Sequence, residues 1–177
     1  AAAGLDLQGS LQAAGGSITL GVTASSAAVS DAVVHVADTA RIDVAGTFIA
    51  SPGTQGLRQG TLLDAGSVTL KGSNAGVVVE AGAQIDLHGT AATVDLTGSG
   101  PTPTTRAQTL EGSAGTVLVH TEGRFQFDGT LQAQAGGPTA AGGSFALESE
   151  RPQVFDPAAP DLRRIVVTDG SADRKST

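Results

Sequence analysis

The chain contains no cysteine, methionine, tryptophan or tyrosine among its 177 residues, and its only aromatic side chains are five phenylalanines. The absence of cysteine excludes disulfide bonds and metal sites built from thiolates. No apolar run approaches the roughly 18 to 20 residues that a membrane-spanning helix needs. The few phenylalanines cannot supply aromatic girdles at two membrane interfaces. We therefore expect no insertion into a membrane.

Basic side chains are also scarce. The chain has 10 Lys and Arg against 17 Asp and Glu, which gives a formal net charge of −7. Half of the basic residues lie after position 150, and the first 150 residues contain Arg41, Arg58, Lys71, Arg106 and Arg124. Affinity for phosphate backbones comes largely from Lys and Arg, so we expect no nucleic-acid partner.

Small residues are abundant, with 25 glycines, and the hydrophobic fraction of 40% is sufficient for a folded core. Glycine interrupts nearly every stretch of ten residues, and each glycine inside a helix costs about 1 kcal/mol. No segment of helical length repeats apolar residues at i, i+3, i+4 and i+7. These features predict a chain that is nearly all β.

Three short phrases recur along the chain. The first, Leu-Asp-Leu-Gln-Gly-Ser at 5–10, returns in similar form at 42–47, 85–90 and 125–130, and its central residues Asp6, Asp43, Asp86 and Gln126 are 37, 43 and 40 positions apart. The second phrase has five residues and occurs at 16–20, 66–70 and 143–147. It begins with Gly-Ser, continues with one apolar residue and then Thr or Ala, and ends with Leu. The third is a valine-rich run at 33–36, 77–80 and 117–120. Each phrase alternates apolar and variable residues between turn-forming residues, a pattern typical of short strands.

Short strands joined by glycine turns are found in sandwiches, propellers and solenoids. A sandwich does not repeat its sequence, and a propeller blade depends on aromatic signatures that this chain lacks. We therefore predict a parallel β-helix, a solenoid with about 20 residues per rung, so that two rungs account for each interval of about 40. Asp6, Asp43 and Asp86 are then expected to point outward on every second rung, about 10 Å apart.

The pattern also predicts which side chains face inward and where the rungs end. Val78, Ile85 and Val94 are expected inside, as are Phe125 and Phe127. The rungs are predicted to span residues 1–149, with a proline-containing loop projecting near 98–105. A proline-rich loop or linker is expected over 150–162, followed by one further strand and a frayed end over 163–177.

The phrases Ile-Asp-Val-x-Gly-Thr and Gly-Gly-Ser-Ile-Thr-Leu resemble the shaft of the filamentous haemagglutinin group of large bacterial exoproteins, over about residues 4–147. The resemblance implies a right-handed parallel β-helix, export through a partner outer-membrane pore (two-partner secretion), a location on the bacterial cell surface, and a role in adhesion or toxin delivery. The secretion domain of that family carries Asn-rich motifs, whereas this chain has the single Asn74, so the resemblance indicates an internal or late segment of the shaft.

The implied partners are the remaining rungs of a longer parent exoprotein, the outer-membrane transporter during secretion, and a host receptor or glycan. The opening Ala1-Ala2-Ala3, without Met or a leader, fits a segment of a longer chain.

Parallel β-helices also include polysaccharide lyases and hydrolases, which group carboxylates and a basic side chain on one sheet face. The residues available for such a site are Asp38, Asp43, Asp64, Asp86 and Asp95, with Arg41 or Arg58. Because the Asp positions repeat with the rungs, we interpret them as solvated outward residues. We therefore expect no enzymatic activity and assign no catalytic residue, cofactor or metal site.

The three histidines, His35, His88 and His120, lack the spacing of metal ligands and are interpreted as surface residues. Two alternatives to a structural shaft stay open. One is a polysaccharide lyase or hydrolase. The other is a carbohydrate- or receptor-binding module.

Overall fold

The computed structural model describes residues 4–25, 32–51, 53, 56–98 and 104–150. Sixteen strands and no α-helix occupy these ranges, which confirms the prediction of an all-β chain. Accordingly, this part of the molecule has no helix of the length and apolarity required to cross a membrane.

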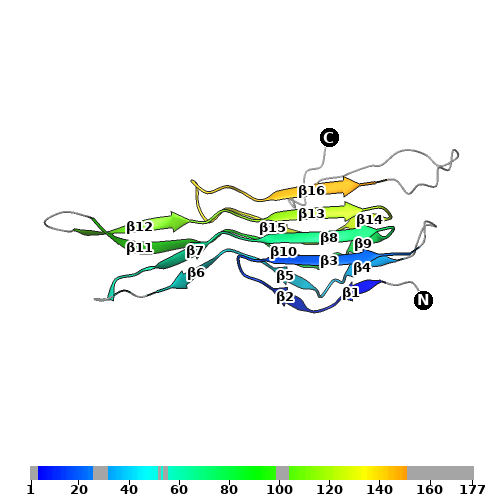
Figure 1. Ribbon diagram of the computed structural model, residues 1–177, viewed down its shortest axis with the longest axis horizontal. Helices are drawn as coiled ribbons and strands as arrows, with labels where there is room; N and C mark the ends of the chain where they lie inside the picture. The colour runs from blue at the N-terminus through cyan, green and yellow to red at the C-terminus, as the bar shows by residue number, and fades with distance from the viewer. Residues whose placement is uncertain (1–3, 26–31, 52, 54–55, 99–103, 151–177) are drawn as a thin grey trace, which may run out of the picture.

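Twelve of the strands form three four-stranded parallel sheets (Figure 1). Sheet A contains β1 (Leu5–Leu7), β4 (Val33–Val36), β9 (Gly76–Val79) and β14 (Phe125–Phe127). Sheet B contains β2 (Ser10–Gln12), β5 (Arg41–Asp43), β10 (Gln84–Asp86) and β15 (Thr130–Gln132). Sheet C contains β3 (Ser17–Thr23), β8 (Ser67–Ser73), β13 (Thr116–Thr121) and β16 (Ser144–Ser149).

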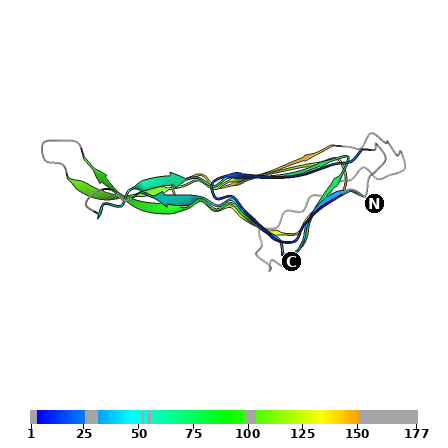
Figure 2. The same ribbon diagram turned by 60° about the horizontal axis from the view of Figure 1, so that its bottom comes forward.

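The chain visits sheets A, B and C in this order four times, so each pass adds one strand to each sheet. Figure 2 shows the three sheets enclosing a triangular section. The second and third passes each leave the triangle between sheets B and C to form an antiparallel hairpin, β6 (Thr47–Ala50) with β7 (Gly60–Leu63) and β11 (Ala91–Thr97) with β12 (Thr105–Glu111). Parallel sheets stacked in this way are compatible with a β-solenoid.

The core lies inside the triangle and is aliphatic. Residues that pair across neighbouring strands stack there in register, as Val34 does on Val77 and Ile42 on Ile85, and all four side chains are at most 1% exposed. Burying each such side chain contributes about 1.5–3 kcal/mol. The first and last passes are less covered, so that Leu5, Leu7, Phe125 and Phe127 are only partly buried against this core.

The corner between sheets B and C is narrow because the backbones of adjacent passes touch there. A Cβ built on Gly66 would lie 1.5 Å from the carbonyl oxygen of Gly16, and one on Gly115 would lie 2.0 Å from that of Gly66. The same carbonyls accept hydrogen bonds from the amides of Ser67 (3.0 Å) and Thr116 (3.1 Å). Glycine is therefore required before β8 and β13 by close backbone approach.

The pairing corrects the expected alignment of the aspartates. Asp6 pairs with His35 in sheet A, whereas Asp43 pairs with Asp86 in sheet B. The first recurring phrase thus combines strands of two sheets, and the prediction that Asp43 and Asp86 lie two rungs apart is wrong. The patterns were confused because Leu5-Asp6-Leu7 is strand β1 itself, whereas Ile42-Asp43-Val44 crosses the end of β5, and both segments read apolar-variable-apolar.

The predicted rung of about 20 residues is also wrong. Leu5 pairs with Val34, Val34 with Val77, and Val77 with Phe125, so successive passes take 29, 43 and 48 residues. The longer passes contain the hairpins. The valine-rich run at 117–120 belongs to sheet C, not to sheet A with the other two runs.

Of the three aliphatic residues that were expected inside, two are buried. Ile85 is fully buried in the core, and Val94 is buried in the β11–β12 hairpin, outside the main core cluster. Val78 was assigned wrongly: it pairs with His35 on the outward side, while Val77 and Val79 point inward and are fully buried.

The expected domain limits are described only in part. The strands continue to Ser149, and the loop predicted near 98–105 is the far end of the β11–β12 hairpin, of which residues 99–103 lie outside the described residues. The predicted linker over 150–162, beyond Glu150, and the predicted strand over 163–177 also lie outside the described residues.

Candidate functional site

The outward face of sheet B brings together three of the residues considered for a polysaccharide-cleaving site. Arg41 and Asp43 lie on β5, and Asp86 lies on the neighbouring strand β10. The other four candidates lie apart from this face. Asp38 is in the turn after β4, Asp64 is in the corner after β7, and Asp95 and Arg58 are in the hairpin region.

A groove of about 290 Å³ follows this face across all four strands of sheet B. Its outward side chains are Ser10, Gln12, Arg41, Asp43, Gln84, Asp86 and Gln132. Because parallel strands lie about 4.8 Å apart, a ligand lying along the stack would meet one row of polar groups at a regular interval. The groove contains both hydrogen-bond donors and acceptors.

The two aspartates in this groove also have a local structural function. Oδ1 of Asp43 accepts the backbone amide of Ala45 (3.0 Å), and Oδ1 of Asp86 accepts that of His88 (3.0 Å). An aspartate carboxylate that accepts a hydrogen bond from the backbone amide two residues later in the chain forms an Asx turn. The second oxygen of Asp43 accepts Nε2 of Gln12 at 3.0 Å. Turn formation therefore explains why these positions are aspartate.

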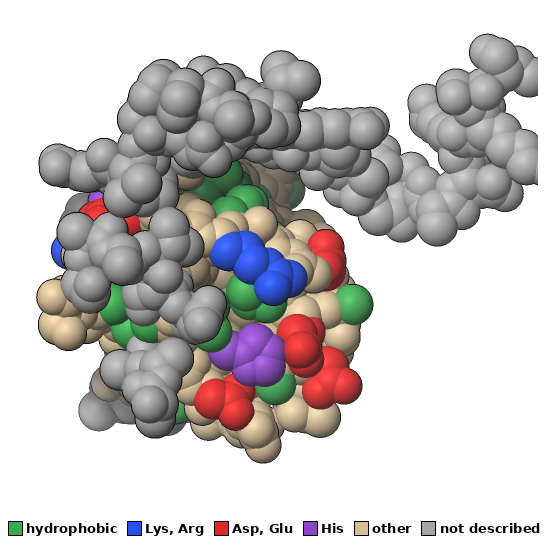
Figure 3. All heavy atoms as spheres, turned by 90° about the vertical axis from the view of Figure 1, so that its right-hand side faces the viewer, with side chains coloured by type: hydrophobic (Ala, Val, Ile, Leu, Met, Phe, Trp, Pro, Cys, Tyr) green, Lys and Arg blue, Asp and Glu red, His purple; other side chains and the backbone are tan. Residues whose placement is uncertain are grey.

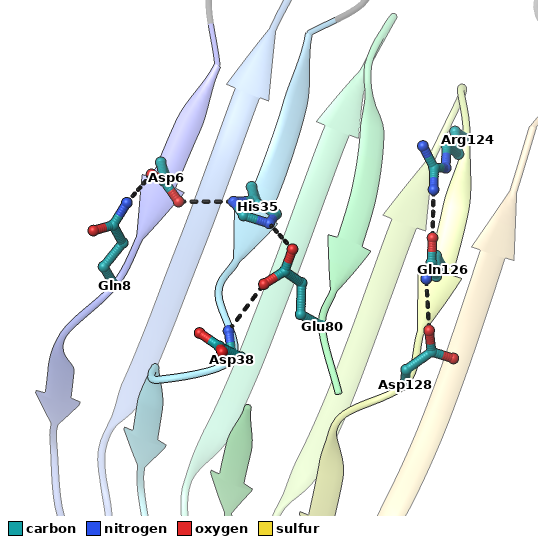
Figure 4. Close-up of polar contacts among 8 residues, drawn as sticks. All are labelled: Asp6, Gln8, His35, Asp38, Glu80, Arg124, Gln126 and Asp128. Carbon is teal, nitrogen blue, oxygen red and sulfur yellow. Dashed lines mark hydrogen bonds and ion pairs between the residues drawn. The ribbon is translucent and has the colours of Figure 1, made fainter. Parts of the chain in front are cut away.

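A second polar cluster lies on the outward face of sheet A, where Figure 3 shows acidic side chains around a histidine. Nδ1 of His35 is 2.8 Å from Oδ1 of Asp6, and Nε2 is 3.0 Å from Oε1 of Glu80 (Figure 4). The hydrogen bonds to Asp6 and then Glu80 raise the pKa of His35 above its ordinary value of 6.5. The same bonds from His35 lower the pKa of Asp6 and of Glu80.

The carboxylates of this cluster have further partners. Nε2 of Gln8 donates to Asp6 at 2.6 Å, and the backbone amide of Asp38 donates to Glu80 at 3.1 Å. Both ring nitrogens of His35 face carboxylates, so neither is directed at a shared metal position. In the part of the chain that the structure describes, no group of three or more His, Asp and Glu side chains could hold a metal ion.

Sequence reasoning missed this cluster because its members are distant along the chain. His35 is 29 residues from Asp6, and Glu80 belongs to the following pass. Only the correct register of β1 on β4, with Asp6 opposite His35, would have brought the first pair together.

The other two histidines have different surroundings. Nδ1 of His88 is 2.5 Å from Oδ1 of Asp86, two residues earlier in the chain. His120 on β13 has one ring nitrogen 3.5 Å from Glu122 and the other 3.5 Å from Glu148 of β16. All three histidines are thus paired with carboxylates rather than solitary.

The remaining candidate aspartates stabilise the projecting region. Arg58 donates to both carboxylate oxygens of Asp95, with Nη2 at 2.7 Å and Nε at 3.2 Å, and these bonds lower the pKa of Asp95. Oδ1 of Asp64 accepts the backbone amide of Ser113 at 2.7 Å. These contacts link the second pass to the third.

The two polar faces are thus the groove of sheet B and the histidine cluster of sheet A. The aspartates of the groove and the carboxylates of the cluster all accept hydrogen bonds from neighbouring groups of the chain.

Comparison with protein-family models, with curated proteins and with solved structures finds no match for this chain.

Proposed function

We propose that this chain is a shaft segment of a secreted, cell-surface exoprotein of the filamentous haemagglutinin type, folded as a right-handed parallel β-helix. Its function is structural: it supports attachment to host or neighbouring cells and has no catalytic activity of its own. The observation that carries the proposal is the single aliphatic interior shared by three parallel sheets that gain one strand each with every pass.

This arrangement suits a rod because its contacts repeat along one direction. Each pass hydrogen-bonds only to the passes beside it, so length can increase without any change in cross-section. The partly buried side chains of the first and last passes, such as Leu11 and Leu131, would be covered by further rungs of a longer parent. The adjacent rungs of that parent are therefore the first proposed partner.

The proposal is tested on the parent exoprotein in its own bacterium, with and without the neighbouring transporter gene. We expect surface-exposed parent only when the transporter is present, and fibres in electron micrographs of the released protein. Compact globular particles, or export that does not depend on an outer-membrane transporter, would contradict the proposal.

A second candidate function is glycan binding, and the groove of sheet B favours it. Its amide, carboxylate and guanidinium groups can exchange hydrogen bonds with sugar hydroxyls, and they recur from strand to strand along the stack. A chain of sugars presents hydroxyls at a similarly regular interval, which makes an extended glycan the ligand class that fits.

A glycan array separates this candidate from the shaft alone. Arg41→Ala combined with Gln84→Ala should abolish binding through the groove, while Gln126→Ala on sheet A serves as the matched surface control. Loss of binding on deletion of residues 98–105, with the groove variant unaffected, would place recognition on the hairpin. No binding by the unaltered chain would exclude this second candidate.

A further inference from the structure

His35 contacts carboxylates from the passes on both sides of its own. Asp6 belongs to β1 and pairs directly with His35 of β4, while Glu80 immediately follows β9 on the other side. The two contacts are 2.8 and 3.0 Å long and involve different ring nitrogens. His35 therefore connects three successive passes through one side chain (Figure 4).

The protonation state of the ring determines whether both contacts are hydrogen bonds. An ionised carboxylate only accepts hydrogen bonds, and a neutral imidazole has a single N–H. The neutral ring can therefore satisfy only one carboxylate and turns a lone pair toward the other. The cationic ring donates to both, and such charge-assisted bonds are the stronger kind.

The strand that depends most on this contact is β1. Within the described residues of the 177-residue chain it is one of the two edge strands of sheet A, it is three residues long, and it pairs with β4. Its inward residues Leu5 and Leu7 are only partly buried. Edge segments with few buried contacts open at the lowest free energy, so a side-chain bond has a larger relative effect on β1 than on the inner strands.

We propose that His35 is a pH-sensitive clamp, which holds the first pass on the stack while it is protonated and releases β1 when it loses its proton. The release falls on β1 because Glu80 is also held by the backbone amide of Asp38 in the second pass, whereas the other bond of Asp6 is to Gln8 of its own pass. Asp6 and Glu80 raise the pKa of His35, so the clamp is lost at a higher pH than that at which an unpaired histidine loses its proton.

The other groups facing His35 do not replace either carboxylate. Its neighbour across to β9 is the apolar Val78. At β14, the side chain of Arg124 donates to Gln126 and that of Gln126 donates to Asp128, so these three side chains are bonded to one another. Asp38 contributes its backbone amide to Glu80. Asp6 and Glu80 are thus the charged side chains in contact with the ring.

The first test uses the unaltered 177-residue chain. Long-range proton–nitrogen NMR spectra of the His35 ring should show the doubly protonated form as the majority species at pH 6.5. Hydrogen exchange, corrected for the intrinsic rate at each pH, should show protection over residues 4–9 falling about three- to fivefold between pH 6 and pH 8.5, while residues 84–86 are unchanged. A mostly neutral His35 ring at pH 6.5, or equal protection of residues 4–9 at both values, would overturn the proposal.

The second test replaces the ring. His35→Gln cannot titrate, so residues 4–9 should exchange with the same low protection at pH 6 and pH 8.5. His88→Gln is the matched control, because His88 contacts the carboxylate of Asp86 within its own pass, and residues 4–9 should respond to pH as in the unaltered chain. A pH response that persists in His35→Gln would refute the clamp; should this variant fail to fold, the spectra of the unaltered chain decide the question.

Discussion

Replacement of Gly66 by alanine tests the finding that neighbouring passes touch through their backbones between sheets B and C. A Cβ on Gly66 would lie 1.5 Å from the carbonyl oxygen of Gly16 and 2.6 Å from its carbonyl carbon. Neither partner is free to move, because Gly16 accepts the amide of Ser67 at 3.0 Å and the amide of Gly66 donates to Val44 at 2.8 Å. The methyl group must therefore displace main chain that is hydrogen-bonded on both sides.

The expected cost follows from these contacts. Forcing extra volume into a packed site costs about 1–3 kcal/mol when side chains can adjust, and the upper end applies where the obstacle is backbone. Loss of the Ser67–Gly16 hydrogen bond adds about 1 kcal/mol. Alanine recovers about 0.4–1 kcal/mol by restricting the unfolded chain. We therefore expect Gly66→Ala to lower the free energy of unfolding by about 3 kcal/mol.

Urea unfolding followed by circular dichroism measures this difference, with Gly142→Ala as the matched control. A Cβ on Gly142 meets nothing within 4 Å, so that substitution should be neutral or slightly stabilising. The urea midpoint of Gly66→Ala should fall well below that of Gly142→Ala, with similar slopes. Equal midpoints for the two variants would refute the close backbone contact.

Three further predictions concern the register, the core and the acid response. Val79→Thr buries a hydroxyl and should cost about 1–3 kcal/mol, whereas Val78→Thr should be nearly neutral in the same urea assay; equal losses would contradict the outward assignment of Val78. Ile85→Ala should cost about 2–5 kcal/mol because the side chain is fully buried, and a loss below 1 kcal/mol would argue against a packed interior. The lowered pKa of Asp95 beside Arg58 means that its contribution to stability is complete above the ordinary carboxyl pKa and is lost as the pH falls through the lowered value. Asp95→Asn should therefore reduce the acid-induced decrease of the urea midpoint, and an unchanged decrease would count against this ion pair.

Local features of the sequence were sufficient to locate strands in each of the three parallel sheets, but not the strands of the two hairpins. The Gly-Ser phrases at 16–20, 66–70 and 143–147 all fall in sheet C, and Ile18 pairs with Val68 as their alignment requires. This succeeded because alternation over a few residues and the flanking turn residues act within one strand. The inward positions of Ile85, Phe125 and Phe127 followed from the same local pattern.

The passes could not be delimited in this way. The strands of sheets A and B are only three or four residues long, so the phrases containing Asp6 and Asp43 look alike although they occupy different sheets. The hairpins also present alternating strand patterns, which made two insertions resemble additional rungs. Neither ambiguity can be resolved without knowing which strands pair. The pairing depends on contacts between residues that are 29 to 48 positions apart in the chain.

The candidate site was predictable to the same limited extent. Arg41, Asp43 and Asp86 were recognised as possible site residues, and the structure does bring them to one face. The contact of His35 with Asp6 and Glu80 was not predicted, because it depends on the pairing of β1, β4 and β9. Glycine is required for different reasons along the chain: in the described residues three glycines have a positive φ, whereas Gly66 is required by its close approach to the backbone of Gly16.

The strand pairing gives the recurring aspartates Asp43 and Asp86 a structural role that differs from the one expected from the sequence. Asp43 and Asp86 lie on directly neighbouring strands, where like charges are unfavourable. At the same position in the first and last passes the residues are Gln12 and Gln132, which carry no charge. The two passes with aspartate are the two that continue into hairpins, and in both the carboxylate closes the turn by accepting the amide two residues on. The aspartate therefore marks the passes that leave the stack to form a hairpin, and the turn it closes offsets the repulsion between the two charges.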